Sequence, residues 1–155
     1  MPRLYKVLST VHTGITVSSL RNATAFWTDV LGFEIVSEGS LPPGDFIDNL
    51  VGVAGAALRY VVVGAPGHRI ELLEYQAPAD RTVTRPRSCD VGSVHIAFSV
   101  DGLDAVLAGA AELGWYAVGQ VQTVKSGPKT GTRAIYIRSE DGVTVELQEP
   151  PTQPN

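Results

Sequence analysis

The sequence predicts an α+β protein made of two repeated modules, each with the order strand, helix and three further strands. The chain has 155 residues, which suits one domain or two small modules that share a core. Residues 11–33 match residues 94–115, and the segment GHRIELLEY (67–75) matches GVTVELQEP (142–150). We therefore expect a single domain over 1–155, divided into module one (8–76), a linker (77–91) and module two (92–150).

The repeat pairs residues of similar type at matching places in the two modules. A gap of one residue is needed inside the helical part of the repeat. The aligned pairs are His12 with His95, Leu20 with Leu103, Leu31-Gly32-Phe33 with Leu113-Gly114-Trp115, and Glu71 with Glu146.

In module one, alternating residues at 11–17 predict a strand, and Ser18 or Ser19 is a suitable helix N-cap. Apolar residues from Leu20 to Val30 have helical spacing, and Gly32 is a natural stop for that helix. The remaining strands are expected at 33–38, 57–63 and 69–75. The segment 41–55, which contains PPG, is expected to be a long loop or a short helix.

In module two, the strand is expected at 94–100, and Asp101 is the expected cap of the following helix. Leu103, Val106, Leu107, Ala110 and Leu113 form the apolar stripe of that helix, which Gly114 ends. Strands at 116–122, 133–138 and 143–148 follow. The linker has proline and mixed charge but no apolar period.

Strand alternation sorts the side chains of both modules onto two faces. The residues Ile70, Leu72, Val145 and Leu147 face the helices, and the opposite, concave face receives one His or Glu per strand: His12, Glu71, His95 and Glu146. Each of these side chains alone has an ordinary structural explanation. Two imidazoles and two carboxylates at repeat-related positions instead predict a site for one divalent ion, with Ni, Zn, Co, Mn or Fe(II) all acceptable by ligand type.

The same four residues, the LGF turn (31–33) and the DGVTVEL ending (141–147) resemble the vicinal oxygen chelate superfamily, which includes glyoxalase I, methylmalonyl-CoA epimerase, fosfomycin-resistance proteins, extradiol dioxygenases and bleomycin-resistance proteins. The resemblance spans about residues 8–150. It implies βαβββ modules whose sheets curl into an open, cup-shaped barrel around a metal. Members of the glyoxalase and epimerase type have a fourth ligand at the position of Glu71, whereas dioxygenases and fosfomycin-resistance proteins keep the two His and the last Glu.

This ligand set favours a metal-dependent isomerase or lyase that chelates two neighbouring oxygens of a small substrate and transfers an α-proton through a stabilised enolate. Glu146 or Glu71 is the expected base, and the residues leave open which of the two it is. Two alternatives are an Fe(II) dioxygenase and a non-catalytic protein that sequesters an antibiotic. No organic cofactor is expected.

Charge and composition limit the partners. Lys and Arg number 12 against 16 Asp and Glu, a net charge of −4, which argues against a nucleic-acid binder. No apolar run is long enough to span a membrane, and Cys89 is the single cysteine, so a cytoplasmic protein is expected. Exposed sheet edges predict a homodimer, in which modules pair within one chain or between two.

One basic loop adds a weaker prediction. Lys125, Lys129 and Arg133 lie in VKSGPKTGTR (124–133) and are suited to a phosphate or carboxylate group of a substrate. A solvated charged loop is the favoured interpretation of these residues from sequence alone.

Overall fold

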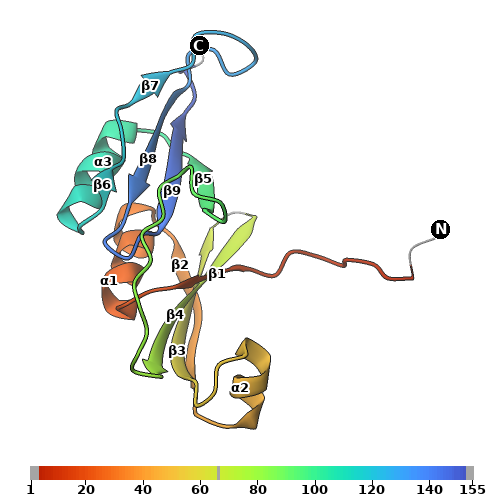
Figure 1. Cartoon of the computed structure of the whole chain (residues 1–155). Helices are drawn as coiled ribbons and strands as arrows, with labels where there is room; N and C mark the ends of the chain where they lie inside the picture. The colour runs from red at the N-terminus through yellow and green to blue at the C-terminus, as the bar shows by residue number, and fades with distance from the viewer. Residues whose placement is uncertain (1–3, 66, 153–155) are drawn as a thin grey trace.

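The computed structural model describes residues 4–65 and 67–152, and it contains two mixed sheets with a helix against each (Figure 1). Module one contains β1 (Thr13–Thr16), α1 (Leu20–Ala25), the π-helical turn η1 (Phe26–Val30), β2 (Glu34–Leu41), α2 (Asp45–Val51), β3 (Ala57–Ala65) and β4 (His68–Ala77). Module two contains β5 (His95–Ser99), α3 (Leu103–Glu112), β6 (Tyr116–Ala117), β7 (Gln122–Thr123), β8 (Arg133–Arg138) and β9 (Thr144–Glu149). The expected α+β class and the order of elements are confirmed, except that the strand expected at 116–122 is two short strands.

The two sheets have the same topology. The first has the order β1-β4-β3-β2 and the second β5-β9-β8-β6, with β7 also paired to β8. In each, the first strand is parallel to the last strand of its module and lies at a free edge. The sheets do not close into a barrel within the chain, so the expected cup is present only as two separate concave halves.

One apolar core joins the two modules through their helix-facing sides. Ile70, Leu72, Val145 and Leu147 are fully buried in it, as strand alternation predicts. Between the modules, the rings of Phe26 and Trp115 stack with centroids 3.7 Å apart. In Figure 1, α1 and α3 lie together on one side of both sheets. The concave faces, which carry the predicted ligands, therefore point away from the core.

The first helix changes its winding halfway. It begins as an α-helix, with Ser19 as N-cap accepting a hydrogen bond from the backbone N–H of Asn22. At Phe26–Val30 it widens to a π-turn, in which the N–H of Leu31 donates to the carbonyl of Phe26 at 3.2 Å. The aligned helix α3 has no such turn, and the segment from Leu103 to Leu113 is one residue shorter than the matching segment from Leu20 to Leu31. The wide turn thus accommodates the gap in the repeat.

Both helices are capped by a glutamate from the last strand of their own module. Glu74 Oε2 accepts from the N–H of Leu20 at 2.7 Å, and Glu149 Oε1 accepts from the N–H of Leu103 at 2.8 Å. These backbone hydrogen bonds are the largest cause that lowers the pKa of each carboxyl. The expectation that Asp101 caps α3 is wrong: the cap position is Gly102, which has no side chain to supply an acceptor.

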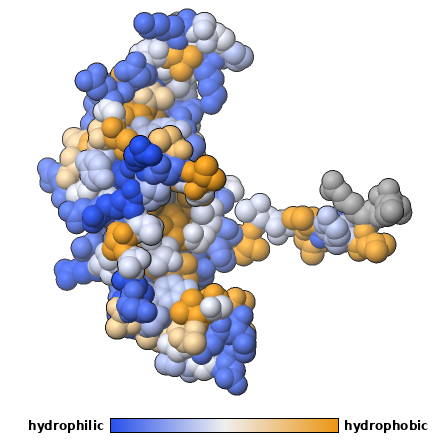
Figure 2. All heavy atoms as spheres, viewed as in Figure 1, coloured by the Kyte–Doolittle hydropathy of each residue, from blue (hydrophilic) through white to orange (hydrophobic). Residues whose placement is uncertain are grey.

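Two segments lie outside the sheets. Helix α2 confirms the short-helix alternative for 41–55, and its Ile47 packs with Leu58 on the concave side of the first sheet. Residues 4–12 form an extended arm that projects from the body (Figure 1). Leu4 and Leu8 on the arm and Phe46 on α2 are exposed, and Figure 2 shows apolar surface along the arm and around α2. None of the described helices is long and apolar enough to cross a membrane.

Candidate metal centre

The first predicted ligand pair meets at the free edge of the first sheet. His12 comes immediately before β1, and its Nε2 lies 3.1 Å from Oε2 of Glu71 on β4. Gly14 is the register partner of Glu71 on β1, and Val62 is its partner on β3. Small and apolar neighbours therefore leave space beside the carboxylate, and the pair is partly open to solvent, with 38% of the His12 side chain and 23% of the Glu71 side chain exposed.

The second pair has the same geometry at the free edge of the second sheet. His95, the first residue of β5, places its Nε2 3.2 Å from Oε2 of Glu146 on β9. Ala97 takes the position of Gly14 as register partner of the carboxylate. The repeat seen in the sequence thus produces two equivalent half-sites, which we define as His12/Glu71 and His95/Glu146.

The atoms of each half-site are spaced as two ligands of one ion would be. Ligands at about 2.1 Å from a divalent ion, at right angles to each other, lie about 3 Å apart. The measured N···O distances of 3.1 and 3.2 Å match this spacing. Imidazole nitrogen and carboxylate oxygen are also donors that first-row divalent ions accept. The residues of each half-site fit a shared metal ion.

The chain does not bring the two half-sites together. Among residues 4–65 and 67–152, no group of three or more His, Cys, Asp or Glu side chains is arranged to hold a metal. Each half-site lies on a concave face, and the core between the modules lies on the other side of both sheets. Each chain therefore presents two half-sites of two ligands.

The second half-site carries polar neighbours that the first lacks. Tyr136, the register partner of Glu146 on β8, places its hydroxyl 3.2 Å from Nε2 of His95. Gln148 donates to Glu146 Oε1 at 2.6 Å, and Lys129 Nζ donates to Gln148 Oε1 at 2.9 Å. Burial and then the nearby charge of Glu146 raise the pKa of Tyr136, so its hydroxyl stays protonated as a hydrogen-bond donor.

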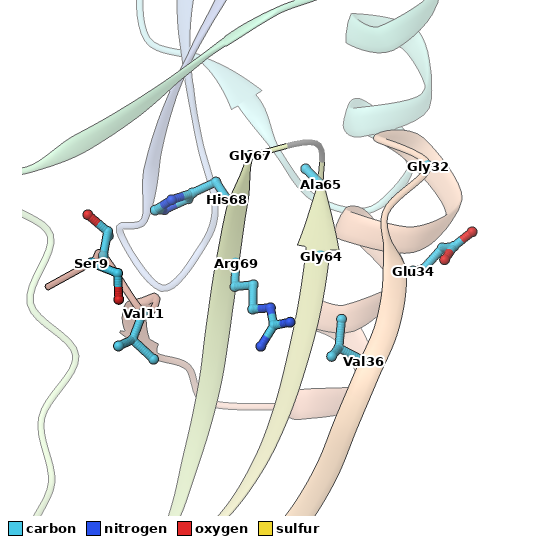
Figure 3. A pocket seen from close by; sticks show the side chains of 11 residues that line it. Ser9, Val11, Gly32, Glu34, Val36, Gly64, Ala65, Gly67, His68 and Arg69 are labelled. Carbon is cyan, nitrogen blue, oxygen red and sulfur yellow. The ribbon is translucent and has the colours of Figure 1, made fainter.

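A pocket adjoins the first half-site where the arm enters β1 (Figure 3). It is lined by arm residues Ser9 and Val11, by the start of β2 and by the β3–β4 turn. Arg69 lies in it, on the concave face two residues before Glu71, and Glu34 also lines it, with its side chain directed away from Arg69 in Figure 3. His68, at the start of β4, is hydrogen-bonded to the Thr13 hydroxyl at 2.8 Å.

Several of these residues were missed from sequence although signals for them exist. Tyr136 could have been found by applying strand alternation to 133–138, since it has the parity that faces Glu146. The capping glutamates Glu74 and Glu149 each follow a predicted ligand by three residues, in ELLE and ELQE. An odd spacing on a strand places the second carboxylate on the helix side.

Two concave mixed sheets with a His/Glu pair at each free edge define a two-module protein of the vicinal-oxygen-chelate type. Comparison with known proteins agrees: residues 9–147 match the model of the Glyoxalase/Bleomycin resistance protein/Dioxygenase superfamily. The chain belongs to this superfamily. Its members typically bind a divalent metal and small-molecule substrates and typically form dimers.

Several individual proteins are similar to this chain in sequence or fold. A 2-epi-5-epi-valiolone epimerase from Actinomyces sp. is 32% identical over 143 residues, covering 88% of this chain and 76% of the relative. The uncharacterized protein YaeR of Escherichia coli K12 is 31% identical over 138 residues, covering 89% and 93%. A glyoxalase family protein from Bacillus cereus has the same fold, with a TM-score of 0.81 at 24% identity, covering 98% of this chain and 100% of that one.

Proposed function

We propose that this protein is a divalent-metal-dependent isomerase or lyase that moves a proton at the carbon next to a carbonyl group. The observation that carries the proposal is the pair of equivalent half-sites, with N···O distances of 3.1 and 3.2 Å. Four protein ligands including Glu71 suit proton transfer better than oxidation by O₂, because they leave few coordination positions on the ion for O₂ and a chelating substrate together. The relative that is named an epimerase supports the isomerase side of the proposal.

We also propose that the complete site forms between two copies of the chain. The stacked rings of Phe26 and Trp115 fix the modules of one chain with their helix sides together, so its concave faces cannot close on each other. The free edges β1 and β5 carry the half-sites and have backbone groups open for a neighbour. A two-fold dimer sets β1 of one copy beside β5 of the other and produces two identical sites.

The residues of the two modules then have distinct tasks. His12, Glu71, His95 and Glu146 would hold the ion, which supplies a Lewis acid for two neighbouring substrate oxygens. Glu71 and Glu146 approach from opposite modules, so their carboxylate oxygens can address opposite faces of a planar carbon centre, as epimerisation requires. Val62 presents an apolar surface beside Glu71, while the Tyr136 hydroxyl is placed to donate a hydrogen bond to a substrate oxygen.

The test is exchange of the α-proton with solvent deuterium, followed by mass spectrometry. The metal-loaded protein is offered hydroxyketones, 2-oxo acids, hemithioacetals and acyl-CoA thioesters, with an oxygen electrode in parallel. We expect deuterium uptake without oxygen consumption, and a loss of about 10²–10⁴ in rate for Glu71→Gln or Glu146→Gln, whichever replaces the base. Oxygen consumption with ring cleavage of a catechol would support a dioxygenase instead. Tight binding of an unchanged antibiotic with no exchange would support sequestration.

Metal content gives a readout independent of turnover. We expect one divalent ion per chain after loading and desalting, and loss of that ion in both His12→Ala and His95→Ala. His68→Ala is the matched control, because His68 pairs with Thr13 outside both half-sites. Equal metal content in all variants would refute the ligand assignment.

A further inference from the structure

Arg69 and Lys129 are two exposed cations on the concave face that the proposed chemistry does not use. Arg69 lies two residues before Glu71, in the pocket beside the first half-site (Figure 3). Lys129 lies in the loop before β8 and contacts Gln148, two residues after Glu146. Arg69 precedes Glu71 along β4, whereas Lys129 is bound to Gln148, which follows Glu146 along β9.

The structure separates the three basic residues of the 124–133 loop. Arg133 points to the helix side, where Asp104 and Glu149 bind its guanidinium at 2.7 and 2.8 Å. Its charge is therefore neutralised. Lys125 makes no hydrogen bond or ion pair with the described residues, whereas Lys129 Nζ bonds Gln148 Oε1 at 2.9 Å on the concave face. A neutral amide accepts this bond, so the charge of Lys129 is not cancelled by it.

The proposed dimer brings Arg69 and Lys129 to the same end of the cavity. In the proposed dimer β1 of one copy lies edge to edge with β5 of the other and both concave faces point to the ion. The two-fold axis that relates the two modules is then perpendicular to the strands, so β1 and β5 run antiparallel. The residues that precede Glu71 along β4 then lie beside those that follow Glu146 along β9. Arg69 of one copy therefore faces Gln148 and Lys129 of the other.

The opposite end of the same cavity has a different character. There the residues that follow Glu71 are apolar: Leu73 has the position that Gln148 has in module two, and it packs with Tyr60 and Tyr75 beneath α2. Module two also has a cation at this end, Arg138, the register partner of Thr144, but its guanidinium is buried and donates to the Thr144 and Ser88 hydroxyls, whereas Arg69 and Lys129 are exposed. An anionic group on a chelated substrate would therefore be attracted to the end with the exposed cations.

We propose that Arg69 of one copy and Lys129 of the other form an anion subsite, which selects substrates that carry a phosphate or carboxylate group near the chelated oxygens. This inference rests on the proposed function, since it places the subsite beside the shared metal centre. Gln148 is a positioning residue, because its amide holds the Lys129 ammonium and donates to Glu146 at once. Charge-assisted hydrogen bonds from two cations make the anionic compound bind more tightly than its neutral counterpart.

The experiment compares binding of dihydroxyacetone phosphate and dihydroxyacetone to the metal-loaded full-length protein by titration calorimetry. We expect the phosphate compound to bind at least about tenfold more tightly, and Arg69→Ala and Lys129→Ala each to weaken it by about tenfold while changing dihydroxyacetone binding less than about twofold. Lys125→Ala, in the same loop, is the matched control and is expected to have no effect. Hydroxypyruvate against hydroxyacetone repeats the comparison for a carboxylate.

The outcomes separate this inference from the proposed function. Equal affinity for charged and neutral compounds, or an effect of only one of the two substitutions, would overturn the shared subsite even if α-proton exchange is observed. Charge selectivity that needs both Arg69 and Lys129, without α-proton exchange for any compound, would support the subsite and refute the proton-transfer chemistry. Metal content is measured for each variant, and a lost ion in either would count against a role restricted to the substrate.

Discussion

Two double variants test whether a metal centre is shared between chains. His12→Ala/Glu71→Ala removes the first half-site, and His95→Ala/Glu146→Ala removes the second. Within residues 4–65 and 67–152, each chain offers only these two His/Glu pairs, 3.1 and 3.2 Å across. Each variant alone therefore keeps two ligands per site and is expected to lose stoichiometric metal. In a mixed dimer, one cavity receives both damaged pairs and the other receives both intact pairs.

The size of the recovery follows from this arrangement. Random exchange makes about half of the dimers mixed, and one of two cavities is intact in each, so a one-to-one mixture regains about one quarter of the wild-type metal. Dimers purified through two different tags regain about one half. The assay is elemental analysis after unfolding, mixing, refolding and desalting, with light scattering as the control for assembly. A mixture that binds no more metal than its parents would refute a site shared between chains.

The remaining predictions concern stability and acid sensitivity. Glu74→Ala removes the side-chain cap of α1 and is expected to lower the free energy of unfolding by about 1 kcal/mol in urea titrations, whereas the exposed Glu112→Ala is expected to have little effect. The pKa of Glu74 is lowered in the folded state, so the contribution of this carboxylate to stability is complete above its ordinary pKa of about 4.3 and is lost as pH falls through the lowered value. The difference in unfolding free energy between wild type and Glu74→Ala is therefore expected to shrink below about pH 4. A difference that grows there would contradict this reasoning. Trp115→Ala removes the ring stacked on Phe26 and is expected to cost about 3–5 kcal/mol, measured by thermal denaturation with the near-ultraviolet circular dichroism of the aromatic core as a second probe.

The sequence predicts the sheets well because their pattern is local. Alternation at 69–75 and 143–148 assigns Ile70 and Leu147 to the core and Glu71 and Glu146 to the other face, and both assignments to the core are confirmed. The same rule fails at Val94, which is 75% exposed because β5 begins only at His95. A single residue at a strand end has no neighbour that forces it inward.

The arrangement of the modules is not predictable by the same reasoning. Alternation determines which face a side chain is on, but it does not determine whether two concave faces meet within a chain or between chains. That choice depends on the aromatic contact of Phe26 with Trp115, two residues 89 positions apart whose pairing has no local signature. The convergence of four ligands on one ion and a cytoplasmic location remain predictions.

The capping of α3 shows a second limit. Asp101 is the right residue type next to the helix start, yet the acceptor comes from Glu149, 46 residues later than Leu103. Side-chain caps are inferred from neighbours in sequence, whereas this carboxylate arrives through the pairing of β9 with β5 and β8. Only the repeat, ELLE matched with ELQE, carries the information.

The wide turn at Phe26–Val30 shows how the two halves of this protein can differ in length without losing their chemistry. One added residue in a strand would move every later side chain to the opposite face and turn a histidine or glutamate into the core. A helix instead absorbs an added residue in a single π-turn and returns the chain to the same direction. Insertions and deletions should therefore be tolerated between Leu20 and Leu31 far better than between Arg69 and Tyr75, and a scan of single-residue insertions would map the ligand strands by their intolerance.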